Sequence, residues 1–243
     1  MIELSLPIAF LHSFTGAFDF ILHQREAQTR FVQVGGLGQV WELTRTHLEV
    51  SGLALAGSLA LALPVGAALG HRGRGEMFAI GLGNAGRAVP ELAVIAFLVA
   101  FIGIGLRNVV LALMVLGIPP ILTNTFVAVK QVDRDAVGAA RGIGMRETQI
   151  LTRIQLPLAV PTIMSGVRTA AINIVATATI APLAGVLTLG DFILSRNVYG
   201  DQGVLAGAIL VALLALIVEL SLAGVQWLLT PRGLALQRER AAA

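Results

Sequence analysis

The feature that most constrains this chain is a series of long segments without a charged residue. Residues 50–70 form one such segment of 21 positions, while residues 108–129 and 169–190 form two more of 22 each. A helix needs about 20 apolar residues to cross the hydrocarbon core of a bilayer. The segments therefore predict an integral membrane protein, whose 243 residues are better counted in membrane spans than in soluble domains.

The composition agrees with this interpretation. Only 13% of the residues are charged, whereas soluble domains carry about 25%. The net charge of +3 includes no dense basic cluster, which argues against a nucleic-acid partner, and the absence of cysteine excludes disulfides and thiolate sites. The chain is expected to be an all-α protein of the lipid bilayer.

Charge-free runs, extended to their polar boundaries, predict five core transmembrane helices. The expected spans are 48–70, 77–103, 108–130, 158–182 and 203–229. They divide the chain into three sections: an N-terminal peripheral or amphipathic segment over 1–47, a transmembrane domain over 48–229, and a cytoplasmic tail over 230–243.

The N-terminal segment leaves one alternative open. Residues 7–22 are apolar, but they are short for a span and contain His12 and Asp19. They fit either a peripheral amphipathic segment, which we favour, or a sixth span.

Basic residues set the expected orientation. With five spans, the connections 71–76 and 130–157 share one side of the membrane with the tail, and together they carry ten of the 17 basic residues. The opposite connections between spans carry only Arg107 and Arg196. Because positive residues stay in the cytoplasm, the long connection 130–157 is predicted to be cytoplasmic.

Motifs for catalysis are missing or misplaced. The ATP-binding P-loop needs Lys followed by Ser or Thr, but the only lysine, Lys130, precedes Gln131. GLGNAG at 81–86 matches the G-x-G-x-x-G pattern of dinucleotide-binding sites. Because it lies inside a predicted span, we interpret it as a site of close helix packing. We expect a non-catalytic subunit with no metal or cofactor of its own.

The cytoplasmic connection predicts a small folded unit. Asp133 and Asp135 suit the start of a helix, and Gly142 and Gly144 suit its end. Residues 146–155 then fit a second, amphipathic helix, and Pro157 fits the first turn of the next span. Composition leaves open whether this unit docks on another protein or is an ordered loop without a binding partner. Its length favours docking.

The same stretch resembles the EAA loop of permease subunits of ATP-binding cassette importers. In that pattern E-A-A is followed three residues later by Gly, and nine residues after that by I-x-L-P. Residues 138–140 read Gly138-Ala139-Ala140, Gly144 follows, and Ile154, Leu156 and Pro157 complete the register. The resemblance implies a type I importer transmembrane domain in a bacterial cytoplasmic (inner) membrane.

Further sequence segments are similar to those of permeases for osmoprotectants such as glycine betaine, choline and carnitine. They include ARGIGM at 140–145, LPLAVPTIMSGVRTA at 156–170, INIVATATIA at 172–181 and LGD at 189–191. The resemblance implies two cytoplasmic ATPase subunits that bind ATP and Mg²⁺, a second permease subunit, and an extracytoplasmic substrate-binding protein. The loop would then couple this chain to an ATPase.

Departures from the family pattern refine these expectations. Gly138 stands where the family has Glu, so Arg141 and Arg146 are expected to supply coupling contacts, and a heterodimer is favoured over a homodimer. Leu187-Thr188 replaces the usual Gly pair before LGD.

Polar residues at membrane depth are candidates for the substrate path. Glu91 can line that path, pair with Arg87 four residues before it on the same predicted helix, or pair with Arg168. The candidate set is Glu91, Asn124, Thr125, Arg168, Asn173 and Thr177.

Two other functions remain as alternatives. One is an importer permease for another small solute, such as an amino acid or methionine. The other is a stand-alone channel or secondary carrier, which predicts internal inverted repeats and intramembrane ion sites.

Overall fold

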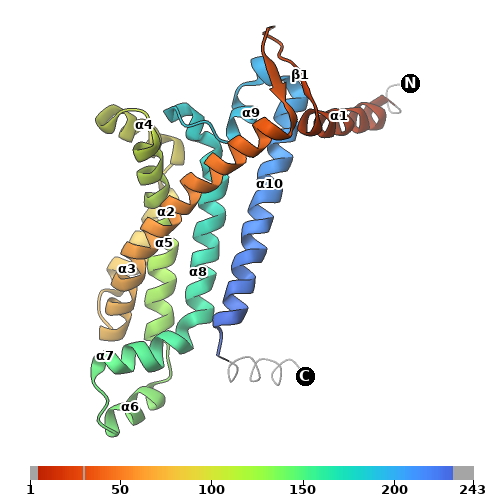
Figure 1. Cartoon of the computed structure of the whole chain (residues 1–243). Helices are drawn as coiled ribbons and strands as arrows, with labels where there is room; N and C mark the ends of the chain where they lie inside the picture. The colour runs from red at the N-terminus through yellow and green to blue at the C-terminus, as the bar shows by residue number, and fades with distance from the viewer. Residues whose placement is uncertain (1–4, 30, 232–243) are drawn as a thin grey trace. The chain divides into compact units, whose positions relative to one another are not determined.

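The computed structural model describes residues 5–29 and 31–231, with side chains described from residue 13 onward apart from those of 85 and 87. The predicted tail 230–243 thus lies almost wholly outside the described residues. The regular secondary structure of the described residues is helical apart from one hairpin (Figure 1), which confirms the all-α class. Four of its helical stretches are long and apolar enough to cross a membrane: Gly36–Arg72, Leu106–Lys130, Glu147–Ala184 and Arg196–Leu229.

The predicted span 77–103 is two helices rather than one. α3 (Glu76–Ala88) ends just before Val89 and Pro90, and α4 (Glu91–Ile102) begins directly after them. Proline has no N–H to donate and disfavours the helical conformation in the residue before it, so it separates the two helices. Arg87 and Glu91 therefore belong to different helices, and the expectation that they are neighbours on one helix is wrong.

The helix that contains the first predicted span begins well before position 48. α2 (Gly36–Arg72) includes twelve residues before position 48 and runs for 37 in all. The charged residues Glu42, Arg45 and Glu49 lie before the charge-free segment 50–70, so that segment did not reveal this part of the helix. The buried positions there nevertheless repeat every three or four residues, as one face of a helix does. They are Val40, Leu43, His47, Val50 and Ala54.

The remaining spans agree with the prediction in place but differ in their ends. α5 (Leu106–Lys130) matches closely. α8 (Leu156–Thr177) changes into a 3₁₀ helix, η2 (Ala178–Ala184), which contains Pro182. α10 (Arg196–Leu229) starts before position 203 and is kinked at Gly200, which adopts φ 68°.

The chain divides into two compact units. Of the described residues, unit 1 contains those within 5–53, Glu91–Leu113 and Val175–Leu216, and unit 2 contains those within Ala54–Pro90, Met114–Ile174 and 217–231. Unit 1 contains α1 (Ser5–Leu22) and a hairpin in which β1 (Gln24–Glu26) pairs antiparallel with β2 (Gln33–Gly35). Whether 7–22 crosses the membrane stays a prediction.

The core of unit 2 is built where α2, α5 and α8 meet. Small residues bring the backbones together, since a Cβ on Gly66 or Gly70 would lie 2.9 or 2.7 Å from a carbonyl oxygen of α5. Within GLGNAG, a Cβ on Gly83 would lie 2.3 Å from the Thr123 hydroxyl, which confirms close helix packing there. Ile121, Val129 and Met164 fill the space between these helices.

Candidate coupling element and translocation path

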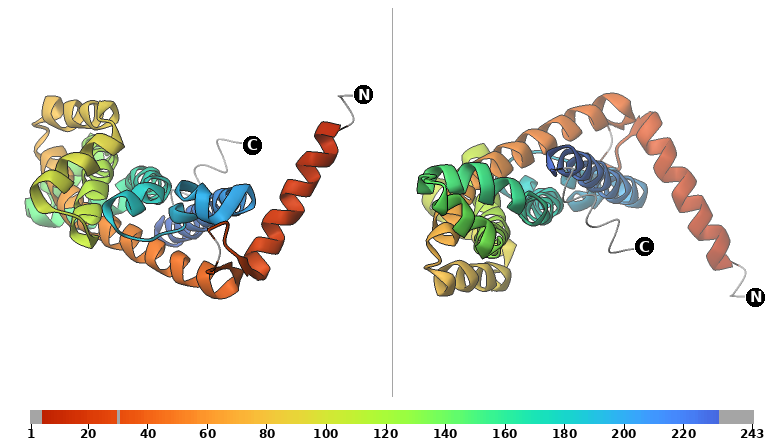
Figure 2. Two further views of the ribbon diagram at one scale, coloured as in Figure 1. Left: turned by 90° about the horizontal axis from the view of Figure 1, so that it is seen from above. Right: turned by 90° about the horizontal axis from the view of Figure 1, so that it is seen from below.

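The predicted cytoplasmic unit folds as two short helices at one end of unit 2, seen from below in the right-hand view of Figure 2. α6 (Arg134–Gly142) begins at Asp133, whose carboxylate accepts the backbone N–H of Asp135 at 2.8 Å. Gly144 has φ 83°, the left-handed conformation that ends a helix. The Met145 N–H donates back to the Ala140 carbonyl at 3.1 Å. The predicted cap and glycine turn are confirmed.

The second helix does not stop before the next span. α7 (Glu147–Ile150) passes into a π-helical turn, η1 (Leu151–Gln155), and then directly into α8. The N–H of Leu156 donates to the carbonyl of Leu151, five residues back. Pro157 therefore lies in a continuous helix instead of opening a new one, and the wider turn accommodates a residue that cannot donate a hydrogen bond. We call residues 134–157 the coupling element.

A chain of polar contacts ties the coupling element to the ends of α2 and α5. Arg141 donates from Nε and Nη2 to the two oxygens of Glu147, at 2.8 and 3.0 Å. The His71 ring, in the last turn of α2, lies 3.1 Å from Glu147 Oε2 and 2.5 Å from Gln155 Oε1. Gln155 in turn donates to the Val129 carbonyl at 3.4 Å.

The electrostatics of this contact chain are those of an exposed ion pair. Glu147 precedes the charge-free run that begins at Ile154, so it lies outside the part of the helix that spans the membrane. The hydrogen bonds from Arg141 lower the pKa of the Glu147 carboxyl, with a smaller contribution from His71. At neutral pH both partners are charged, so the pair links α6 to α7.

The residues predicted for coupling fall into an outer and an inner group. Gly138, Ala139, Arg141, Gly144 and Arg146 are exposed on the coupling element, whereas Ala140 is buried. Ile154, Leu156 and Pro157 are half-buried on the helix that enters the membrane. The first group is therefore accessible to a partner, while the second group lies at and just before the start of α8.

The path candidates are divided between the two units. Glu91 is exposed at the start of α4 in unit 1. Asn124 donates to the Pro120 carbonyl at 2.8 Å on its own helix, and Thr125 is fully buried. Thr177, the last residue of α8, is half-buried in unit 1.

Arg168 has a different partner from the one predicted. Its Nε donates to Glu219 Oε1 at 2.8 Å, and its Nη1 donates to Gln226 Oε1 at 3.0 Å. Both acceptors lie on α10 within unit 2, so the pairing of Arg168 with Glu91 is wrong. The bond links two spans and leaves Arg168 as a tie between helices.

A polar face of α8 was not predicted from the sequence. Thr162, Ser165, Thr169 and Asn173 are all exposed, and their spacings of three, four and four residues place them on one side of the helix. Of these, only Asn173 is among the predicted path residues. The signal was present as a periodic pattern of hydroxyl and amide residues, but it was hidden among apolar neighbours.

Unit 1 contains a packed assembly that includes the LGD stretch. α9 (Gly190–Leu194) lies against η2 so closely that a Cβ on Gly190 would be 1.7 Å from the Thr179 carbonyl oxygen. The Thr188 hydroxyl donates to the Ala178 carbonyl at 2.8 Å and accepts the Gly190 N–H at 3.3 Å. The replacement of the usual Gly pair by Leu187-Thr188 thus adds buried hydrogen bonds.

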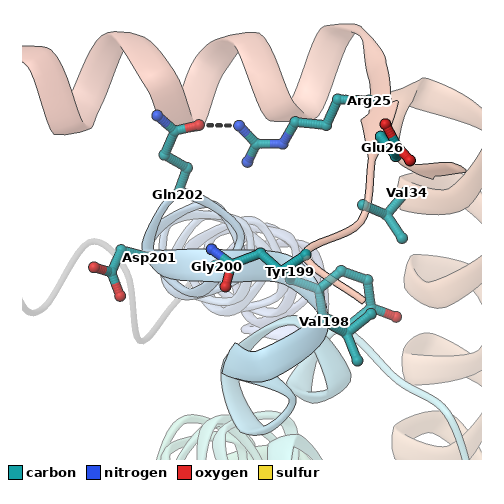
Figure 3. Close-up of a pocket in the computed structure, with 9 residues that line it drawn as sticks. Arg25, Glu26, Val34, Val198, Tyr199, Gly200, Asp201 and Gln202 are labelled. Atoms are coloured by element: carbon teal, nitrogen blue, oxygen red, sulfur yellow. Dashed lines mark hydrogen bonds between the residues drawn. The ribbon is translucent and has the colours of Figure 1, made fainter. Parts of the chain in front are cut away.

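The hairpin of unit 1 borders a hollow shown in Figure 3, with a volume of about 390 Å³. The Gln28 N–H donates to the Val198 carbonyl at 3.1 Å, and Arg25 bonds to the side-chain oxygen of Gln202. The Tyr199 hydroxyl donates to Asp191 at 2.6 Å. These contacts fasten the hairpin to the start of α10.

Four apolar helical stretches long enough to cross a membrane, with a short helical element before α8, fit a membrane subunit of a transporter. The comparisons with known proteins specify its class. Residues 60–228 match the family model described as binding-protein-dependent transport system inner membrane component, and the chain belongs to this family. It is a multi-pass protein of the bacterial inner membrane and serves as a transport subunit rather than an enzyme.

Two relatives extend the match over most of the chain. The carnitine transport permease protein OpuCB of Listeria monocytogenes is 36% identical over 218 residues, covering 88% of this chain and 98% of the relative. The glycine betaine/carnitine/choline transport system permease protein OpuCB of Bacillus subtilis (strain 168) is 34% identical, covering 84% and 94%.

A solved structure supports the same fold. The chain superimposes on the inward-facing MetNI methionine ABC transporter with a TM-score of 0.67 at 18% identity, covering 80% of this chain and 98% of that one. At this identity the likeness concerns the fold alone. The family implies an ATPase and a substrate-binding protein as partners.

Proposed function

We propose that this chain forms the translocation path for a quaternary-ammonium osmoprotectant of the glycine betaine, choline or carnitine type. The two relatives named for such solutes share 36% and 34% identity with it over more than four fifths of its length. The observation that carries the proposal is the coupling element, whose glycine turn and continuous passage into α8 suit the transfer of movement from an ATPase to a membrane helix.

The coupling element is proposed to bind the ATPase through its exposed residues. Gly138, Ala139, Arg141, Gly144 and Arg146 are exposed, and Arg141 is already oriented by Glu147. A push on α6 would pass along the Arg141–Glu147–His71 contacts to the end of α2, and through α7 into α8. This is a rigid-body switch, in which short helices move with the spans they contact.

The polar face of α8 is proposed to line the path. Hydroxyl and amide groups exposed on a spanning helix are better placed toward another helix or a wet cavity than toward lipid. The face carries no charge, so it offers hydrogen bonds to a passing solute without holding it strongly. A neutral lining suits a zwitterion or a single quaternary ammonium group.

Selection is proposed to occur in a separate binding protein. Quaternary ammonium groups are usually held by aromatic cages. Tyr199, the only tyrosine, is engaged by Phe20 and Phe192 at ring-centroid distances of 6.1 and 5.0 Å. The aromatic side chains of this cluster therefore pack on one another instead of forming a cage.

The proposed assembly contains two ATPase subunits and two permease subunits that differ from each other. Gly138 supports two different permease subunits, because the Glu that the family uses at this position would have to come from the other permease subunit. Gly138 is exposed and a Cβ there meets no atom within 4 Å, so Gly138→Glu is sterically tolerated. If this element contacts the ATPase, the substitution changes the affinity for that subunit.

Reconstitution tests the proposal. The permease would be co-purified with its ATPase and its binding protein, placed in liposomes, and assayed for ATP-dependent uptake of labelled glycine betaine, choline, carnitine and methionine. Uptake of a quaternary ammonium solute is expected, and it should fall in Ala140→Glu, where a charge replaces a buried methyl group. ATP-dependent uptake of methionine alone would disprove the substrate class. A purified protein that never retains an ATPase would disprove the importer itself.

A further inference from the structure

A hollow next to the coupling element is lined by an excess of basic side chains. It has a volume of about 340 Å³ and lies in unit 2, between the ends of α2 and α5 and the inner side of α6. We call it the basic hollow. Its ionisable lining residues are His71, Arg72, Lys130, Arg134 and Arg141.

Two of these cations have no acidic partner among the described residues. Lys130 Nζ lies 2.5 Å from Glu76, and Arg141 shares Glu147 with His71. Asp133, beside Arg134, is engaged in capping α6. Arg72 and Arg134 are both exposed and remain available to an anion. The hollow therefore has the charge of an anion site with two free guanidinium groups.

The position of the basic hollow places it at the membrane surface. Residues 50–70 carry no charge, and His71 and Arg72 follow them immediately. Lys130 likewise follows the charge-free residues 108–129 of α5. Basic residues that end two neighbouring spans lie at the level of the lipid headgroups, where cytoplasmic pockets between helices attract anionic lipids.

An apolar surface continues from the basic hollow into the membrane. Leu61 and Val65 precede Arg72 by 11 and seven residues, which is three and two helical turns, so all three share one face of α2. Leu61 is 54% exposed and Val65 is 45% exposed. An acyl chain can lie along this face while its phosphate reaches Arg72, whereas a free phosphate ion would make no use of it.

We propose that the basic hollow binds the phosphate headgroup of an anionic phospholipid from the cytoplasmic leaflet. The headgroup would bridge Arg72 at the end of α2 and Arg134 at the start of α6. It would thereby link the coupling element to the membrane surface as well as to the ATPase. This site goes beyond the proposed transport function and does not depend on which solute is carried.

Lipid retention in nanodiscs tests the site. The full transporter complex would be placed in phosphatidylcholine nanodiscs containing phosphatidylglycerol, and the phosphatidylglycerol retained per permease would be counted by native mass spectrometry. A basic residue near the surface contributes about fivefold to the binding of an anionic lipid, so Arg72→Gln with Arg134→Gln should weaken retention about thirtyfold. Arg72→Lys with Arg134→Lys keeps both charges and should retain most of the binding.

The controls distinguish a lipid site from a phosphate-ion site and from an ATPase contact. Arg74→Gln with Arg153→Gln removes the same charge from exposed positions outside the lining of the hollow and should leave retention unchanged. Equal retention by the wild type and the Arg72/Arg134 glutamine variant would overturn the proposal. So would calorimetric binding of inorganic phosphate, in nanodiscs of phosphatidylcholine alone, that is lost in the same variant. Loss of the ATPase with unchanged lipid retention would assign the hollow to the ATPase and also overturn it.

Discussion

The assembly of η2, α9 and the start of α10 in unit 1 and the coupling element in unit 2 are both short helical insertions in a membrane protein, but different forces hold them. In the first, glycine contacts, buried hydrogen bonds and edge-to-face rings dominate, as in the Phe192–Tyr199 pair with centroids 5.0 Å apart. In the second, exposed charged side chains cross from one short helix to the next. The first region is therefore expected to tolerate little change in its packing, and under the proposed function the second is the one that would move with a partner.

The largest expected effect comes from glycines in the two regions. Gly190→Ala would place a Cβ 1.7 Å from a backbone oxygen, so α9 must separate from η2. We expect a loss of several kcal/mol or failure to fold, measured as the yield of monodisperse protein and its unfolding temperature in detergent. The matched change Gly138→Ala meets open space in α6 and should stabilise that helix by about 0.5–1 kcal/mol. Equal tolerance of both changes would contradict the comparison.

A smaller effect is expected from the tyrosine that joins the hairpin region to α9. The Tyr199 hydroxyl donates to Asp191 at 2.6 Å and accepts from Gln39 at 3.3 Å. Tyr199→Phe keeps the ring contacts and removes both hydrogen bonds, which should cost about 1–2 kcal/mol in unfolding free energy. Chemical denaturation in detergent measures it. Ser195→Ala, which removes one hydrogen bond to the same carboxylate at 2.8 Å, is the milder control.

The glycine turn should affect coupling more than stability. Gly144 has φ 83°, and no atom lies within 4 Å of the position that a Cβ would take there, so Gly144→Ala strains the backbone without a clash. The expected cost is about 1 kcal/mol. Because this strain changes the angle between α6 and α7, substrate-stimulated ATP hydrolysis by the complex should fall clearly. Gly142→Ala, which also meets open space but lies at the helix end, should leave that rate near the wild type.

The smallest effect on stability is expected for Glu147→Gln. The pair with Arg141 is exposed to solvent, and exposed pairs contribute little. The unfolding temperature should stay within experimental error at pH 7, while hydrogen exchange of the α6 amides should quicken. The pKa of Glu147 is lowered, so its ionic contribution is present above the ordinary glutamate value of 4.5 and is lost as the pH falls through the lowered value. The variant should lack that acid dependence, and a large loss of stability at pH 7 would show that the element is more rigid than we infer.

The sequence by itself determined the membrane class, the place of most spans and the form of the coupling element. Charge-free runs reflect the thickness of the hydrocarbon core. Asp133 caps α6 with its own side chain two residues from its partner, and Gly144 ends the helix by its own backbone conformation, so neither signal needs tertiary information. The helical period of the buried positions in α2 before residue 48 was also present in the sequence. It was not recognised because charged residues occupy the other face of the same helix.

Only the tertiary structure decided which residues meet. The division of the second predicted span at Pro90 and the π turn before Pro157 are seen only in the structure. The choice of Glu219 for Arg168, and the gathering of Arg72, Lys130 and Arg134 around one hollow, join residues more than fifty positions apart. Such pairings follow from helix packing, which a pattern along one chain does not contain, because hydrophobic periodicity gives the face of a helix but not the helix that it faces.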